Sequence, residues 1–308
     1  MKNWLFGIVI GIFFLMLAAC GKDPSTNEGK DKIYVTTTIA QIEDIVKNVG
    51  TDYVQTESLM GPGVDPHLYK ASQGDIKKLQ KADIIFYNGL HLEGKMGEVL
   101  EKMSEQRPTV AVTRDIPEEK LITDPQNPNA HDPHVWFDIE LWKYAVDTVA
   151  NELSSLDPKH EKEFKQNAEE YKQQLDKLYE ESRKKVEEID ENSRVLVTAH
   201  DAFAYFGRSF GFEVEGLQGL STDSEYGLKD VQSLIDLLVE RNIKAVFIES
   251  SISEKSINAV VEGAKERGHE VEIGGELFSD AMGEEGTKEG TYIGMFEHNM
   301  ETIVSALK

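Results

Sequence analysis

The sequence predicts an α/β protein of two lobes, each with a central, mainly parallel sheet flanked by helices, joined by a single long backbone helix. Three observations predict this fold. Short apolar strand candidates alternate with helical stretches, and this alternation occurs in two similar halves of the chain. Between the halves lies one long stretch with a helical apolar pattern and no glycine.

The first half contains four strand candidates separated by helical stretches. The strands are expected at residues 32–36, 54–60, 82–87 and 109–112, with helices near 42–46, 74–81 and 94–105. Short buried strands that alternate with helices favour βαβ units, because a helix carries the chain back across the sheet. We therefore expect a parallel sheet in this half.

The stretch between the halves is typical of one long helix. From Pro158 to about Ile189 the chain has no glycine and no further proline, and apolar side chains recur at spacings of three and four. Asp157 and Pro158 suit the cap and the first position of a helix. At 1.5 Å per residue this helix is roughly 50 Å long. A coiled-coil arm is the alternative, but the position between two α/β halves favours a rigid connector.

The second half shows the same alternation of strand and helix candidates as the first. Strands are expected at residues 194–198, 213–217, 245–248 and 270–273, and helices at 203–210, 231–241 and 256–268. We expect these strands to form a second parallel sheet.

The N-terminus is typical of an exported lipoprotein precursor. Lys2 precedes an apolar run over residues 4–17, which is too short to span a bilayer securely, and Ala18 and Ala19 precede Cys20. Small residues before a cysteine suit a signal peptidase and attachment of a diacylglycerol. Cys20 is the only cysteine, so it forms no internal disulfide. A plain signal peptide and an uncleaved anchor helix are the alternatives.

These patterns divide the chain into five parts. We expect a signal peptide at residues 1–19, a lipidated tether at 20–30, an N-terminal lobe at 31–156, a linking helix at 157–190 and a C-terminal lobe at 191–308. The tether contains no apolar side chain after Cys20 and therefore cannot bury a core.

The strongly acidic composition excludes one class of partner. The formal net charge is −23, whereas a nucleic-acid-binding protein needs a basic surface. The same charge opposes electrostatic adhesion to anionic lipid, so membrane attachment has to come from the lipid anchor. A negative electrostatic field also concentrates cations near the protein. A role in solubility explains the negative net charge equally well.

Four polar residues follow predicted strands or rigid loops in positions that suit ligand binding. Two come from each half: His67 and His134 from the first, His200 and Asp280 from the second. Ligands of two-lobed α/β proteins bind beyond the carboxyl ends of the strands. Three imidazole nitrogens with one carboxylate suit a divalent first-row transition metal better than calcium or magnesium, which prefer oxygen ligands.

At these residues the chain resembles the metal-receptor lipoproteins of bacterial manganese and zinc ABC importers. The resemblance covers essentially all of the mature chain. The motifs that carry it are Gly63-Val64-Asp65-Pro66-His67, Asp132-Pro133-His134-Val135-Trp136, Thr198-Ala199-His200-Asp201-Ala202-Phe203, Phe247-Ile248-Glu249-Ser250 and Gly274 to Met282. The resemblance implies that His67, His134, His200 and Asp280 bind the metal. It also implies two α/β lobes joined by one long helix, and an importer permease as partner.

The resemblance leaves manganese and zinc open as the cargo. The third ligand is His in some members of the family and Glu in others, mostly manganese receptors, so His200 leaves zinc possible. Many zinc receptors carry a long loop rich in histidine and acidic residues between the first two ligands. In this chain His91 is the only histidine in residues 89–130, so no such loop is present. We favour Mn²⁺, with Zn²⁺ as the alternative.

The leading hypothesis is a monomeric binding protein, not an enzyme, on the extracytoplasmic face of the cell membrane. A surface metallohydrolase is disfavoured because four protein ligands leave little room for a substrate, and no His-Glu-x-x-His motif occurs. The hypothesis that the protein is an adhesin leaves the motifs around the four candidate ligands unexplained. We expect a solvent or supporting role for His131, a ligand-orienting or loop-pairing role for Glu249, and ordinary surface positions for His91, His160, His269 and His298.

Overall fold

The computed structural model describes residues 32–308 except residues 126 and 225. The predicted signal peptide, Cys20 and the tether lie outside the described residues. In the part of the chain that is described, no helix is both long and apolar enough to cross a membrane.

The N-terminal half contains the predicted parallel sheet. Its strands lie in the order β2-β1-β3-β4, and each neighbouring pair is parallel. The strands are β1 (Ile33–Thr37), β2 (Val54–Ser58), β3 (Ile84–Tyr87) and β4 (Thr109–Ala111), with helices α2 (Ala40–Gly50), α3 (Gln73–Lys81) and α4 (Gly97–Ser104) between them. The prediction for this half is confirmed, with boundaries that differ by a few residues.

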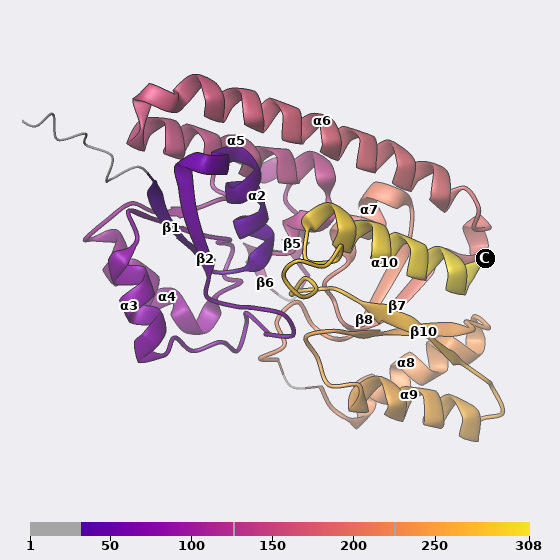
Figure 1. Cartoon of the computed structure of the whole chain (residues 1–308). Coiled ribbons are helices and arrows are strands. Elements are labelled where there is room, and N and C mark those ends of the chain that lie inside the picture. The colour runs from indigo at the N-terminus through magenta and orange to yellow at the C-terminus, as the bar shows by residue number, and fades with distance from the viewer. Residues whose placement is uncertain (1–31, 126, 225) are drawn as a thin grey trace, which may run out of the picture. The chain divides into compact units, whose positions relative to one another are not determined.

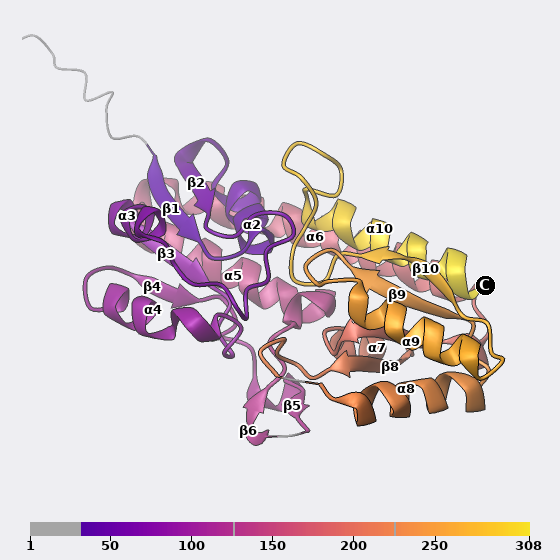
Figure 2. The same cartoon turned by 90° about the horizontal axis from the view of Figure 1, so that it is seen from below.

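The C-terminal half contains two parallel strand pairs. β7 (Val195–His200) pairs with β8 (Glu213–Gln218), β9 (Ala245–Glu249) pairs with β10 (Glu272–Leu277), and β7 also lies beside β9. Helices α7 (Ala204–Phe210), α8 (Leu228–Glu240) and α9 (Lys255–Glu266) separate the strands. Figure 2 shows α8 and α9 side by side on the same face of these strands.

Three elements were not predicted from the sequence. They are helix α5 (Ile139–Leu156), helix α10 (Tyr292–Leu307) and a short antiparallel hairpin of β5 (Thr123–Asp124) and β6 (Asn127–His131). α5 and α10 bury residues on more than one face, so neither shows a single narrow apolar stripe.

The predicted long helix begins with a 3₁₀ turn (Pro158–His160) and continues as α6 (Glu161–Val186), which has 26 residues. Its buried side chains are those of the predicted stripe: Phe164, Ala168, Tyr171, Leu175, Leu178, Ser182 and Val186. They face α5, α2 and α10, along which α6 runs in Figure 1. The coiled-coil alternative is therefore wrong, because the apolar stripe is covered by helices of the same chain.

One hydrophobic core extends through both halves. It joins the N-terminal sheet, α5, α6, α7 and α10, whereas a second core lies between β7, β9, α8 and α9. Residues 33–308 accordingly form one packed unit. The predicted boundaries of the two lobes and the linking helix stay a prediction, but the shared core shows that the two halves are held together by more than one helix.

Candidate metal centre

His67 is presented by the loop between β2 and α3. Gly63 has a left-handed backbone (φ 69°), which glycine adopts without strain, and Pro66 restricts the chain directly before the histidine. The backbone N–H of His67 donates to Asp65 Oδ1 at 2.8 Å. The imidazole is 3% exposed, so this loop turns the side chain inward.

His134 lies in a second Asp-Pro-His segment, just before α5. Its backbone N–H donates to Asp132 Oδ1 at 2.9 Å, and its Nδ1 lies 2.7 Å from the same oxygen. A carboxylate accepts hydrogen bonds only, so Nδ1 is the donor. The lone pair of Nε2 is then directed away from Asp132 and is available as a ligand.

His200 ends β7 and has the same kind of support from a different element. Glu249, the last residue of β9, accepts from the backbone N–H of His200 at 2.8 Å and from its Nδ1 at 2.6 Å. Glu249 orients the imidazole of His200, which was the first of the two expectations, and the backbone that it pairs with is the end of β7 and not a loop. The imidazole of His200 is fully buried.

Asp280 follows β10 and is held by side chains of the N-terminal half. Gln41 Nε2 on α2 donates to the backbone carbonyl of Asp280 at 3.0 Å, and Trp136 Nε1 donates to the carbonyl of Ser279 at 3.1 Å. Asp280 is 1% exposed. The loop that carries this carboxylate is therefore fixed by contacts across the two halves.

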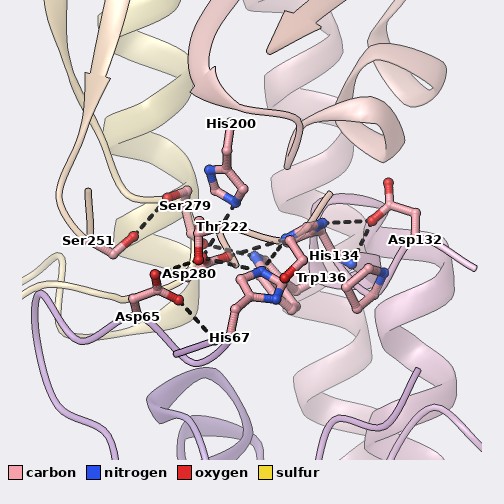
Figure 3. A network of polar contacts seen from close by, with 12 residues as sticks. Asp65, His67, Asp132, His134, Trp136, His200, Thr222, Ser251, Ser279 and Asp280 are labelled. Carbon is pink, nitrogen blue, oxygen red and sulfur yellow. Dashed lines mark hydrogen bonds and ion pairs between the residues drawn. The ribbon is translucent and has the colours of Figure 1, made fainter. Parts of the chain in front are cut away.

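The four predicted residues converge on one point, as Figure 3 shows. Each offers one ligand atom, and these atoms all lie within 4.8 Å of one another. Nε2 of His134 and of His200 lie 3.4 Å from an oxygen of Asp280, and Nε2 of His67 lies 3.7 Å from one. The three imidazole planes meet at angles of 61° to 80°, so the rings fan out around the shared centre.

The polar atoms at this point fit a cation. Among the described residues, both oxygens of Asp280 and Nε2 of His200 are buried without a hydrogen-bond partner. Nε2 of His67 and Nε2 of His134 face each other at 3.3 Å. Leaving buried polar atoms unpaired costs free energy, and two nitrogen lone pairs at this distance repel unless a proton or a cation lies between them. A divalent ion satisfies all of these atoms at once.

Burial and the surrounding carboxylates give the three imidazoles different pKa values. Burial lowers the pKa of His67 to about 3. Burial also opposes a charge on His134, but two neighbouring carboxylates outweigh it and raise the pKa of this residue to about 9. The pKa of His200 is raised well above its ordinary value, because Glu249 and Asp280 outweigh burial. In the metal-free centre these shifts favour the doubly protonated, cationic form of His134 and His200 and the neutral form of His67.

The pKa of the Asp280 carboxyl group is shifted downward, whereas the pKa values of His134 and His200 are raised. Burial alone raises the pKa of Asp280, but the imidazoles around it outweigh burial and lower the pKa well below its usual value. Asp280 is accordingly ionised at neutral pH and supplies a full negative charge to the centre.

The remaining histidines lie outside the cluster. His131, in β6, approaches Glu118 at 3.7 Å, and His91 is exposed. The expectation for His269 is wrong: this residue is 8% exposed, and its Nε2 lies 2.7 Å from the carbonyl oxygen of Ile243. His269 follows Gly268, whose φ of 78° turns the chain after α9, and its ring lies against Ile243 in the segment between α8 and β9.

The sequence analysis missed the residues that support the ligands. Asp132, Gln41 and Trp136 were not singled out, although each contacts a ligand or its neighbour. The repeated Asp-Pro-His tripeptide was a signal for Asp132. No local pattern points to Gln41, because it lies 239 residues from Asp280 in the chain.

Comparison with known proteins identifies relatives that span the chain. A family model described as zinc-uptake complex component A, periplasmic, matches residues 35–306. The manganese-binding lipoprotein MntA of Bacillus subtilis is 59% identical over 304 residues, which are 98% of this chain and 99% of the relative. The zinc-binding protein TroA of Treponema pallidum is 49% identical over 300 residues, which are 97% of this chain and 96% of the relative.

Solved structures show the same fold. The periplasmic zinc-binding protein TroA from Treponema pallidum superimposes with a TM-score of 0.87 at 52% identity, covering 90% of this chain and 99% of that one. A manganese-bound variant of a periplasmic metal-binding protein from Candidatus Liberibacter asiaticus has a TM-score of 0.78 at 26% identity, covering 90% and 100%.

The pKa values predict that metal binding releases protons. At pH 7 a metal ion has to displace one proton from His134 and one from His200, whereas His67 is already neutral. We expect release of about two protons per ion, so that apparent affinity falls on the order of 100-fold for each pH unit below 7. Calorimetric titration with Zn²⁺ in buffers of different ionisation enthalpy measures this number. Binding without proton release, or occupancy that stays constant from pH 7 to about 5, would contradict the assignment.

Proposed function

The chain belongs to the family of zinc-uptake complex component A, and on this premise we propose that it is an extracytoplasmic receptor that captures a divalent transition metal and delivers it to an ABC importer. The single observation that carries this proposal is the buried cluster of His67, His134, His200 and Asp280, whose ligand atoms converge on one point. We propose these four residues as the metal ligands.

The cluster suits binding and delivery better than catalysis. A catalytic metal keeps an open position for water or substrate, usually with three protein ligands. Here four protein side chains surround the centre, and all four are buried. The relatives are likewise named as binding proteins or as substrate-binding lipoproteins of ABC transporters. The chain is a receptor and its metal is cargo.

We propose manganese as the physiological cargo, with zinc as the second candidate. The 59% identical relative is named a manganese-binding lipoprotein, and the 49% identical relative is named a zinc-binding protein. Both oxygens of Asp280 are free of hydrogen bonds from described residues, so a bidentate carboxylate with three imidazoles offers five ligand atoms. This number exceeds the tetrahedral set typical of structural zinc. Zinc nevertheless binds most such sites more tightly than manganese, which keeps it as the alternative.

We also propose that lipid on Cys20 holds the receptor at the membrane and that residues 20–30 serve as the tether. An anchored receptor stays close to the permease that accepts its cargo. The relatives named as lipoproteins support this proposal, as does the register of the apolar run, the small residues and the single cysteine. We further propose that the receptor acts as a monomer, with lobes at 31–156 and 191–308 on either side of the linking residues 157–190.

Replacing a proposed ligand is expected to abolish tight metal retention. In His67→Ala and Asp280→Ala we expect affinity to fall more than about 100-fold, because each change removes a ligand atom from a buried site. Elemental analysis of protein purified from its native host under balanced metal supply measures retention, and it should find about one manganese per wild-type chain.

His91→Asn is the matched control for that experiment. His91 is exposed and has a positive φ of 64°, a conformation that asparagine tolerates, so this variant should retain the wild-type amount of metal. Full stoichiometry in both ligand variants would refute the site. A zinc-only wild-type protein would reverse the choice of metal and leave the site intact.

Loss of the lipid-bearing thiol is expected to free the protein from the membrane. In Cys20→Ser the acyl chains have no attachment atom, so the mature chain should move from the detergent phase to the aqueous phase on phase separation of cell extracts. Metal content should be unchanged, because the ligands lie elsewhere. Equal incorporation of labelled fatty acid into the variant and the wild type would refute lipidation at this residue, whereas an unlabelled variant in the detergent phase would show that the uncleaved apolar run holds it there.

A further inference from the structure

The two Asp-Pro-His segments support their histidines in different ways. In both, the aspartate accepts from the backbone N–H of the histidine two residues later, at 2.8 Å for His67 and 2.9 Å for His134. Asp132 also accepts from the imidazole of His134, which fixes the ring. Asp65 has no such contact with the ring of His67, and no described residue accepts a hydrogen bond from Nδ1 of His67.

The second carboxylate oxygen of Asp65 accepts a hydrogen bond from the C-terminal half instead. Thr222, in the loop after β8, donates its hydroxyl to Asp65 Oδ2 at 2.6 Å, and Figure 3 shows both residues beside His67. The next residue, Asp223, pairs with Lys95 of the N-terminal half at 2.6 Å. Two consecutive residues of this loop therefore reach across to the half that carries His67.

The other three ligands have supports that do not depend on this loop. Buried carboxylates hold the imidazoles of His134 and His200, and Gln41 holds the backbone of Asp280. His67 is the proposed ligand whose Nδ1 has no carboxylate partner among the described residues, and its loop includes the exposed residues Pro62 and Gly63. All four ligands are buried, so a metal reaches the centre only when one of them moves.

We propose that Thr222 and Asp65 form a latch between the two halves that positions His67 over the metal, and that the metal enters and leaves on the side of His67. The proposal rests on the metal-receptor function given above. In the closed state the Thr222 hydroxyl fixes the Asp65 carboxylate, and this carboxylate fixes the backbone of His67. When the loop after β8 moves away, the His67 loop loses its contact with the other half, while the remaining three ligands keep their supports. Thr222 and Asp65 are thus positioning residues that contact no metal.

Removal of the Thr222 hydroxyl is expected to speed metal release. In Thr222→Val, which keeps the size of the side chain, we expect Mn²⁺ to dissociate roughly ten-fold faster from the loaded full-length protein into excess chelator. In Thr222→Ser, which keeps the hydroxyl, the rate should return to within about two-fold of wild type. If Thr222 acts through Asp65, the double variant Thr222→Val/Asp65→Asn should release metal no faster than Asp65→Asn alone.

Thr56→Val is the matched control. Thr56 donates its hydroxyl to the carboxylate of Glu43 at 2.8 Å in a similarly half-buried setting, but this pair has no contact with the metal ligands. Its release rate should equal that of wild type. The unfolding midpoint of each metal-free variant should lie close to that of the wild type, which separates a positioning role from a general loss of structure.

The outcomes separate the latch from the receptor function. If the wild-type chain retains Mn²⁺ and Thr222→Val releases it at the wild-type rate, the latch is refuted and the receptor function stands. Equally fast release by Thr222→Ser and Thr222→Val would also refute the latch, because the hydroxyl would then not be the cause. If the wild-type chain fails to retain either Mn²⁺ or Zn²⁺, the receptor function itself fails.

Discussion

Three imidazoles and one carboxylate are held close together in the interior, and contacts from both halves of the described structure keep them there. The ligand atoms of His67, His134, His200 and Asp280 lie within 4.8 Å of one another and are shielded from solvent. Burying polar atoms that lack partners costs free energy, which a bound divalent cation recovers. In the metal-free centre, protonated imidazoles of His134 and His200 offset part of this cost, because their Nε2 atoms lie 3.4 Å from the oxygens of Asp280.

The packing of the two halves explains how such a cluster is maintained. The first core continues from the N-terminal sheet through α5 and α6 to α10, so the halves do not separate freely. Side chains of one half also hold the backbone of the other, as Gln41 does at Asp280 and Trp136 does at Ser279. Large rearrangement of the lobes would break this core. Metal release through a local movement of the His67 loop would leave this core intact. That loop includes exposed residues, and the hydrogen bond from Thr222 to Asp65 joins it to the other half.

Much of the fold and all four converging residues could be predicted from the sequence, for identifiable physical reasons. Short apolar strands and the stripe of α6 are local patterns, and the candidate ligands stand in Pro-containing loops or at strand ends. The supports could not be predicted in the same way. Gln41, Trp136 and Thr222 act through contacts between residues 143 to 239 positions apart, and no local periodicity reports such contacts. His269 was misplaced because its polar sequence neighbours conceal a ring that turns inward.

X-ray absorption spectroscopy at the metal edge of the purified, loaded protein tests the central claim most directly, since it reports the atoms bound to the ion. The cluster predicts three imidazole nitrogens, visible by their characteristic multiple scattering, together with one or two carboxylate oxygens at about 2.0–2.2 Å. The spectrum of His67→Ala, recorded after the variant is loaded with metal at a concentration above its weakened dissociation constant, should show one imidazole fewer. A first shell of oxygen alone, or a spectrum that is unchanged in that variant, would contradict the proposal that this cluster is where the cargo binds.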